Sequence, residues 1–232
     1  MRTIVLFATY ILITILIIPV LLFCFLIKWP QPISPIVKLA IKLGQKMLRI
    51  RIEVTGLEKV EKKTAYVFMS NHMSFIDGPL LFMLIPQSIR VILKKESFRI
   101  PVIGQAMRQV GFIPVDRKGI KGGKKSIDQA SRVIKEKGFS FLIFPEGTRS
   151  RDGKIQPFKR GGFFISADSQ APVVPISIQG TYELMPKGSF FVKKGKIRVF
   201  FHPIISAYGY DRNNLPKLMN KVKSAIESEL TN

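Results

Sequence analysis

Short runs rich in valine, isoleucine and phenylalanine alternate with amphipathic helical patterns from about Gly56 to the C terminus, and this alternation constrains the fold most. Strands separated in this way by helices form a largely parallel sheet that is covered on both faces. We therefore predict an α/β fold with a mostly parallel central sheet flanked by helices. The expected strands are 66–70, 90–93, 112–115, 140–144, 173–178 and 197–201, and the expected helices are 75–85, 102–110, 124–137, 160–169 and 215–230.

Residues 3–27 contain no charged side chain. A helix of this length covers the ~30 Å hydrocarbon core of a bilayer at ~1.5 Å per residue. Lys28, Trp29 and Pro30 end the run with a cation, an interfacial aromatic ring and a helix breaker. We expect a membrane anchor, either spanning the bilayer or, with a kink at Pro19, lodged in one leaflet.

Residues 36–51 carry apolar side chains at helical spacing on one side and lysine or arginine on the other. The pattern predicts a basic amphipathic helix on an anionic bilayer surface, and the alternative is a helix packed on the domain with a solvated basic face. Residues 1–51 are thus expected to form an N-terminal two-helix membrane-binding element, and residues 52–232 an α/β domain. Cations after the anchor predict a location on the cytoplasmic face of the cell (inner) membrane.

The chain has 37 Lys and Arg against 15 Asp and Glu, which gives a net charge of +22. Such a charge favours an acidic partner: an anionic membrane, a phosphate-bearing substrate or nucleic acid. One cysteine and two histidines exclude a thiolate-rich metal site and leave few ways to build a histidine-rich one, so we expect chemistry without a metal. The sequence lacks a phosphate-binding P-loop in register and a dinucleotide-binding glycine motif.

The segment from Ser70 to Asp77 follows the first predicted strand, where open α/β sheets place their ligands. His72 is suited to taking a proton from a hydroxyl group, and Asp77 to orienting the ring and stabilising the imidazolium. On a continuous helix, five residues would turn the two side chains about 140° apart. They therefore meet only if the segment turns between them. Ser74 and Asp77 also match a helix capping box, which is the structural alternative.

A second polar segment, 145–150, follows the predicted strand 140–144 and contains Glu146, Gly147, Thr148 and Arg149. It is expected at the same sheet edge as His72. The guanidinium fork of Arg149 suits a phosphate group, and the hydroxyl of Thr148 is a further donor. The alternative is a polar turn with a solvent-facing arginine.

Four blocks in this order resemble the 1-acyl-glycerol-3-phosphate acyltransferases and the wider lysophospholipid acyltransferase group. The blocks are Asn71-His72-x-Ser74-x-x-Asp77, Gly111-x-Ile113-x-Val115-x-Arg117, Phe144-Pro145-Glu146-Gly147-Thr148-Arg149-Ser150 and Val173-Val174-Pro175-Ile176. The resemblance implies transfer of an acyl group from acyl-CoA or acyl-ACP to the sn-2 hydroxyl of lysophosphatidic acid. It implies no cofactor besides this thioester co-substrate and no covalent acyl-enzyme.

The same resemblance assigns roles to individual residues. His72 would act as the base, with Asp77 orienting it, while positive side chains would hold the acceptor phosphate. A backbone amide would stabilise the oxyanion. The residues expected to bind the acceptor are Lys94, Arg117, Glu146, Gly147, Thr148 and Arg149.

Other functions also agree with parts of the sequence. The acceptor could be another lysophospholipid or a lyso-ornithine lipid. A membrane-tethered nucleic-acid-binding protein would explain the charge, but no helix-turn-helix or aromatic stacking motif appears among the basic residues, so we expect no nucleic-acid partner. A non-catalytic lipid-binding relative is disfavoured because His72 and Asp77 are both present.

Overall fold

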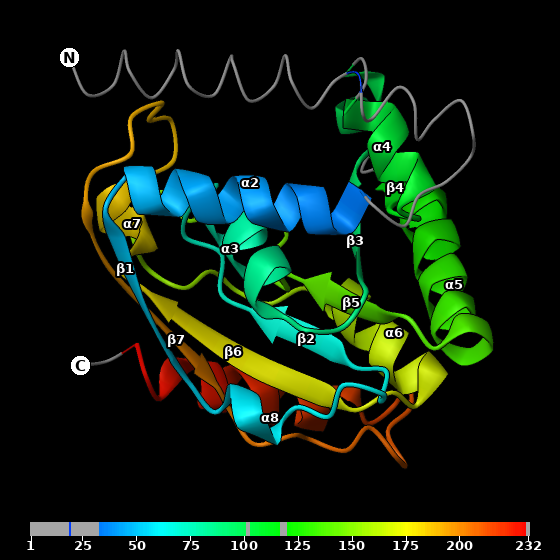
Figure 1. Ribbon diagram of the computed structural model, residues 1–232. Helices are drawn as coiled ribbons and strands as arrows, with labels where there is room; N and C mark the ends of the chain where they lie inside the picture. The colour runs from blue at the N-terminus through cyan, green and yellow to red at the C-terminus, as the bar shows by residue number, and fades with distance from the viewer. Residues whose placement is uncertain (1–18, 20–32, 101–102, 117–119, 231–232) are drawn as a thin grey trace.

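A seven-stranded sheet forms the centre of the part of the chain that the computed structural model describes, which is residues 19, 33–100, 103–116 and 120–230. The strand order is β1-β7-β6-β2-β5-β3-β4 (Figure 1). The strands are β1 (Ile50–Thr55), β2 (Val67–Ser70), β3 (Ile89–Lys94), β4 (Ile113–Val115), β5 (Ser140–Ile143), β6 (Val173–Gln179) and β7 (Gly195–Phe201).

Parallel pairing dominates this sheet. β2 pairs in parallel with β5 and with β6, and β3 pairs in parallel with β5 and with β4. β1 is parallel to β7, and β7 returns antiparallel to β6. The mostly parallel α/β fold that the sequence predicts is confirmed.

Helices cover both faces of the sheet. The α-helices of the described residues after Pro19 are α2 (Ile33–Met47), α3 (Asp77–Leu84), α4 (Ile103–Gln109), α5 (Ile120–Lys137), α6 (Arg160–Ser169), α7 (Thr181–Leu184) and α8 (Leu215–Glu227), and the 3₁₀ helices are η1 (Leu57–Lys59) and η2 (Lys95–Arg99).

The central strand β2 shows why both faces are covered. Phe68 packs into one core cluster with Leu80 and Leu81 of α3, whereas Val67 and Met69 pack into a second cluster with side chains of α5, α6 and α8. Successive side chains of a strand point to opposite faces, so a strand that is apolar at every position needs a layer on each side.

The edge strand β1 was not expected from the sequence. The helical pattern was expected to continue to residue 51, but α2 ends at Met47 and Arg49 has a positive φ of 54°. Ile50 then pairs with Gly195, and the alternating Ile-Arg-Ile-Glu-Val-Thr segment adds to the sheet beside β7. The expected domain boundary after residue 51 falls inside this strand.

The N-terminal helix α2 lies against α3. Lys38 Nζ donates a hydrogen bond of 2.8 Å to the carbonyl oxygen of Ile85, the residue that ends α3. Leu39, Leu43 and Met47 are exposed on the outer side of α2, so the helix shows solvent an apolar row as well as lysines. Apart from Pro19, the uncharged run 3–27 lies outside the described residues. Within those that are described, no helix is both long enough and apolar enough to span a bilayer.

Candidate active site

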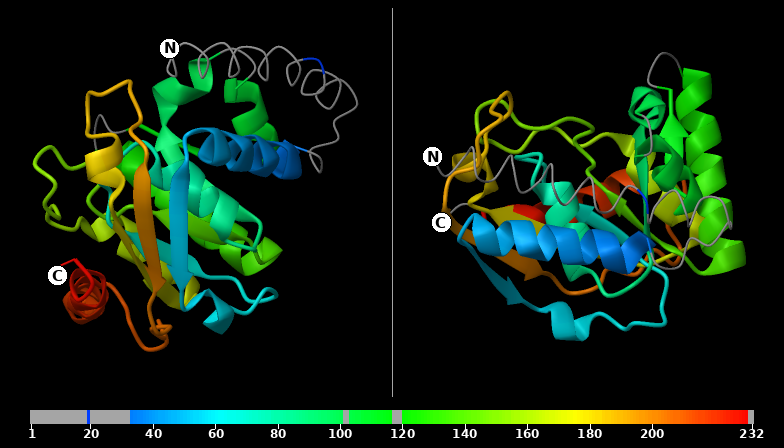
Figure 2. Two further views of the ribbon diagram at one scale, coloured as in Figure 1. Left: turned by 60° about the vertical axis from the view of Figure 1, so that its left-hand side comes forward. Right: turned by 45° about the horizontal axis from the view of Figure 1, so that its top comes forward.

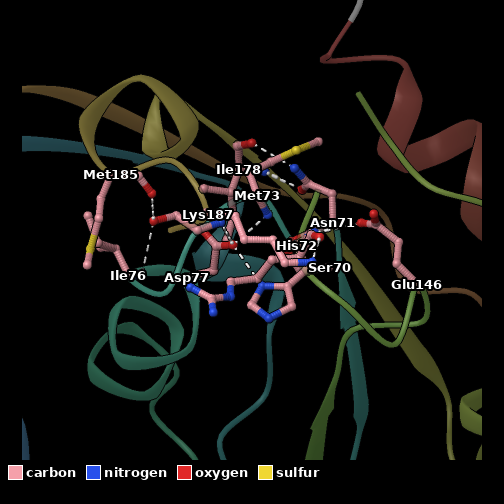
Figure 3. Close-up of polar contacts among 12 residues, drawn as sticks. Ser70, Asn71, His72, Met73, Ile76, Asp77, Glu146, Ile178, Met185 and Lys187 are labelled. Atoms are coloured by element: carbon pink, nitrogen blue, oxygen red, sulfur yellow. Dashed lines mark hydrogen bonds and ion pairs between the residues drawn. The ribbon is translucent and has the colours of Figure 1, made fainter. Parts of the chain in front are cut away.

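The first polar block begins at Asn71, directly after the carboxyl end of β2, and this residue is hydrogen-bonded to β6. Asn71 is fully buried, and its side chain forms two hydrogen bonds with the backbone of Ile178. Nδ2 donates to the carbonyl oxygen at 2.9 Å, and Oδ1 accepts from the N–H at 2.8 Å (Figure 3). This clamp holds the backbone of the next residue, His72, at the edge where the parallel strands end.

His72 and Asp77 meet in the structure. His72 Nδ1 lies 2.9 Å from Asp77 Oδ2. The five-residue separation does not drive them apart because α3 begins only at Asp77, and residues 72–76 turn before it. A hydrogen bond to the carboxylate places the imidazole proton on Nδ1, which leaves Nε2 free to accept a proton.

The same carboxylate oxygen also holds the turn. Asp77 Oδ2 accepts hydrogen bonds of 2.7 Å from the backbone N–H groups of Met73 and Ser74. The bond to Ser74 N–H is one half of a capping box, but Ser74 Oγ does not complete it: this hydroxyl donates to Met185 O at 2.7 Å and accepts from Ile76 N–H at 3.3 Å. Asp77 therefore closes the turn and orients the imidazole at the same time.

The imidazole ring stacks on the side chain that directly follows the neighbouring strand β5. The ring of His72 lies 4.0 Å from that of Phe144, centroid to centroid, at an angle of 16°. The His72 side chain is 20% exposed, whereas that of Asp77 is fully buried. The ring is thus held on one side and through Nδ1, while part of it stays open to a reactant.

Glu146 reaches the backbone of His72. Its Oε1 accepts from His72 N–H at 2.6 Å, and its Oε2 accepts from Gln156 N–H at 2.9 Å. Ser150 N–H in turn donates to His72 O at 2.8 Å. Burial of the carboxyl group raises the pKa of Glu146 to about 7; the two backbone hydrogen bonds act against this shift, and the charge of Asp77 adds to it.

The family resemblance assigns Glu146 to the residues that are expected to bind the acceptor. In the structure its buried carboxylate holds the loop that carries His72. Gly147 follows in the left-handed region, with φ of 73°, and a Cβ there would lie 3.1 Å from Lys159 Nζ. Glycine is the residue that turns the chain here without strain.

Lys187, which belongs to none of the four sequence blocks, adds a cation to the turn that contains Thr148 and Arg149. Its Nζ donates hydrogen bonds of 3.1 Å to Thr148 Oγ1 and to the carbonyl oxygen of Arg149. The Arg149 guanidinium carbon lies 6.0 Å from the centre of the Phe75 ring, beside the first block. Sequence reasoning missed Lys187 because it lies 38 residues beyond Arg149 in a loop without a recognisable motif.

Of the two remaining expected phosphate ligands, Lys94 lies farther along the sheet edge. Lys94 ends β3, on the other side of β5 from β2, and forms an exposed ion pair of 3.6 Å with Glu96. Arg117 lies outside the described residues, after β4. No group of three or more His, Cys, Asp or Glu side chains suited to a metal ion occurs in the ranges that the structure covers.

The second histidine occupies another place. His202 Nε2 lies 2.7 Å from Ser177 Oγ, and that hydroxyl donates to Ile226 O of α8 at 2.7 Å. Burial lowers the pKa of His202. This histidine links the sheet to α8.

Comparison with known proteins places the chain in a family. A family model described as Acyltransferase matches residues 51–179. A 1-acyl-sn-glycerol-3-phosphate acyltransferase of Borreliella burgdorferi is 31% identical over 183 residues, covering 77% of this chain and 72% of that protein. The chloroplastic 1-acyl-sn-glycerol-3-phosphate acyltransferase BAT2 of Brassica napus is 39% identical over 180 residues, covering 74% of this chain and 52% of that protein. The chain thus spans about half the length of this plant relative.

A solved structure extends the match beyond the sequence blocks. The crystal structure of the 1-acyl-sn-glycerophosphate acyltransferase PlsC from Thermotoga maritima matches with a TM-score of 0.79 and 26% sequence identity. The match covers 100% of this chain and 98% of that one. This chain therefore belongs to the acyltransferase family, together with these 1-acyl-sn-glycerol-3-phosphate acyltransferases.

Proposed function

We propose that this protein transfers a fatty acyl group from a thioester donor, acyl-CoA or acyl-ACP, to the sn-2 hydroxyl of 1-acyl-glycerol-3-phosphate, giving phosphatidic acid. The observation that carries the proposal is the hydrogen bond between His72 Nδ1 and Asp77 Oδ2, on a loop that is hydrogen-bonded to the turn bearing Arg149. The relatives named above carry this activity in their names.

The chemistry follows from the orientation of the imidazole. His72 Nε2 takes the proton of the acceptor hydroxyl while that oxygen attacks the thioester carbonyl carbon. The tetrahedral intermediate then collapses, the carbon–sulfur bond breaks, and the thiolate takes the proton from the imidazolium. Asp77 stabilises the imidazolium between the two steps. No enzyme side chain is acylated in this scheme.

The acceptor phosphate is assigned to the turn after β5. A phosphate monoester carries about two negative charges near neutral pH. Arg149 offers a guanidinium fork, and Lys187 adds a cation that is already bonded to the same turn. Family resemblance also assigns Lys94 and Arg117 to the acceptor. Glu146 acts in this scheme by positioning His72.

The lipid substrate supports a membrane location, and the cations that follow the uncharged run favour its cytoplasmic face. Acceptor and product both reside in a bilayer, so a site at headgroup depth avoids extracting their acyl chains into water. The uncharged run 3–27 and the exposed apolar row of α2 support such a placement.

An acyl-transfer assay that crosses acceptors with donors tests the proposal. Lysophosphatidic acid, a lysophospholipid with a larger headgroup and a lyso-ornithine lipid are each offered with labelled acyl-CoA and acyl-ACP. Phosphatidic acid is the expected main product. Preference for either other acceptor would keep the acyl-transfer chemistry and overturn the assignment of the acceptor.

A further inference from the structure

The loop that joins α7 to β7 exposes two adjacent phenylalanine side chains. It comprises residues 185–194, with the sequence Met-Pro-Lys-Gly-Ser-Phe-Phe-Val-Lys-Lys, and is called the finger loop below. Phe190 is 82% exposed and Phe191 is 62% exposed. Neither ring contributes to the core clusters of the described residues.

Hydrogen bonds hold the tip of the finger loop in shape. Ser189 Oγ donates to Phe191 O at 3.0 Å and accepts from Phe191 N–H at 3.0 Å. Ser189 N–H donates to Pro186 O at 3.0 Å, and Lys193 N–H closes the base of the loop by donating to Leu184 O at 2.9 Å. The two rings are thus presented outward by an ordered turn.

The charge of the finger loop favours an anionic surface. Lys187, Lys193 and Lys194 flank the phenylalanines, and no acidic residue occurs in the ten positions. Aromatic rings with flanking lysines suit the boundary between headgroups and acyl chains: the rings enter the apolar region and the ammonium groups stay with lipid phosphates. The same lysines, in a chain of net charge +22, disfavour contact with a second copy.

The finger loop lies near the C-terminal end of α2. In the parallel pairing of β1 with β7, Ile50 lies opposite Gly195, so the end of α2 and the base of the loop are neighbours. Leu48 and Val192 pack on the same core cluster. In all three views the loop stands beside the C-terminal end of α2 (Figures 1 and 2). This end of α2 carries exposed Leu43 and Met47 beside exposed Lys42 and Lys46, so apolar and cationic side chains also lie near the loop.

The finger loop is also tied to both polar blocks of the candidate active site. Met185 O accepts the hydrogen bond from Ser74 Oγ, and Lys187 Nζ donates to Thr148 Oγ1 and Arg149 O. The position of the loop tip is thus coupled to the turn assigned to the acceptor phosphate.

We propose that the finger loop is a second membrane contact, in which Phe190 and Phe191 insert into an anionic bilayer beside the C-terminal end of α2. The insertion fixes the depth of the His72 site relative to the lipid headgroups. This depth role rests on the proposed acyl transfer, whereas the membrane contact itself does not.

Depth-dependent fluorescence quenching in the full-length chain tests the contact. Trp29 is the single tryptophan, so the W29F background accepts one reporter at a chosen place. The test variant is W29F/F190W. The control is W29F/Y208W. Tyr208 is 87% exposed, but it follows the end of β7, whereas the finger loop precedes its start, so the two positions lie at opposite ends of this strand. Both are mixed with phosphatidylglycerol–phosphatidylcholine vesicles that carry brominated acyl chains.

The proposal expects the emission of F190W to be quenched by brominated chains and that of Y208W to stay unquenched. Unquenched F190W on vesicles that demonstrably bind the protein would overturn it. So would a blue shift of F190W emission that follows protein concentration without vesicles, which would indicate a protein partner on this surface.

A second pair of variants separates the contact from catalysis. F190S/F191S is compared with Y208S for partition onto the same vesicles and for acyl transfer. We expect F190S/F191S to partition about tenfold less, since even partial burial of two phenylalanine rings is worth one decade. Its rate on a short-chain acceptor dissolved as monomers should match that of Y208S. Equal partition of the two variants would contradict the proposal. Quenching of F190W in a chain that transfers no acyl group would leave the contact standing and remove the proposed function.

Discussion

The backbone N–H of His72 donates a hydrogen bond of 2.6 Å to Glu146 Oε1, and this bond joins two sequence blocks that lie 74 residues apart. The other oxygen of the same carboxylate holds Gln156 N–H. A single buried side chain therefore sets the position of the proposed base relative to the turn that carries Arg149.

Replacing Glu146 with glutamine should loosen this junction. An amide offers one acceptor oxygen, so its NH₂ group would face a backbone N–H that also donates. We expect E146Q to lose about 1–3 kcal/mol of unfolding free energy and to lower kcat. Denaturant unfolding and acyl-transfer kinetics check this, with E136Q on the exposed face of α5 as the charge-matched control. Equal stability and equal kcat in the two variants would contradict the positioning role.

Glu146 should also leave a signature in the pH dependence of stability. Its pKa in the folded chain is about 7, above the ordinary value of 4.5, because burial disfavours the charge. The folded state thus binds this proton more tightly than the unfolded state does. Its contribution is present below pH 4.5 and is lost as the pH rises through about 7. The difference between wild-type and E146Q unfolding free energies should change over this interval, and a flat difference would refute the assignment.

Changing Asp77 to asparagine should affect activity and stability together. Asp77 Oδ2 accepts from His72 and from two backbone N–H groups, so its charge serves the imidazolium and the turn. We expect D77N to lower kcat by about 10²–10⁴-fold, in the range for loss of general-base catalysis, and to unfold at lower denaturant concentration. Lower stability with an unchanged rate per folded molecule would show that Asp77 stabilises the turn and does not contribute to catalysis.

Lys187 should matter for the acceptor more than for the donor. It bonds Thr148 and Arg149, where the phosphate is assigned. We expect K187M to raise KM for the phosphate-bearing acceptor about tenfold or more, as loss of one charge-assisted hydrogen bond does, with KM for the thioester unchanged. K135M, an exposed lysine of α5, is the control. Kinetics in mixed micelles check this, and equal shifts of both KM values would place Lys187 elsewhere.

His202 should stabilise the fold without contributing to turnover. The Ser177 hydroxyl donates to Ile226 O, so His202 Nε2 is the donor in the hydrogen bond between His202 and Ser177. Burial lowers the pKa of His202 below the ordinary 6.5, so the unfolded chain takes up a proton that the folded chain does not. This stabilisation is present above pH 6.5 and is lost as the pH falls through the lowered value. H202Q should lack this acid dependence and keep kcat, and a loss of kcat would overturn this view.

Local sequence patterns predicted most of the sheet, because a short run of apolar residues indicates a buried strand. Strands β2, β5 and β6 are apolar at nearly every position, and both faces of each are covered. β1 escaped prediction because it is an edge strand whose alternating side chains continue a helical pattern, and only its pairing with β7 defines it.

The candidate site likewise has one part that the sequence predicts and another that it does not. His72 and Asp77 are five residues apart, so a turn between them suffices to join them, and the sequence places that turn after a strand. The contacts of Glu146 with His72 and of Lys187 with Arg149 join distant segments, and no spacing in the sequence encodes them. Family resemblance identified the block that contains Glu146. The contact of its buried carboxylate with the backbone is visible only in the folded chain.

The role of His72 as the base is tested by the rate of acyl transfer to lysophosphatidic acid by H72A, compared with wild type and with H202Q. Circular dichroism and unfolding curves verify that each variant is folded. We predict that H72A loses at least about 10²-fold in kcat while H202Q keeps the wild-type value, since general-base catalysis contributes about 10²–10⁴-fold. A folded H72A protein that forms phosphatidic acid at the wild-type rate would show that His72 is not the base.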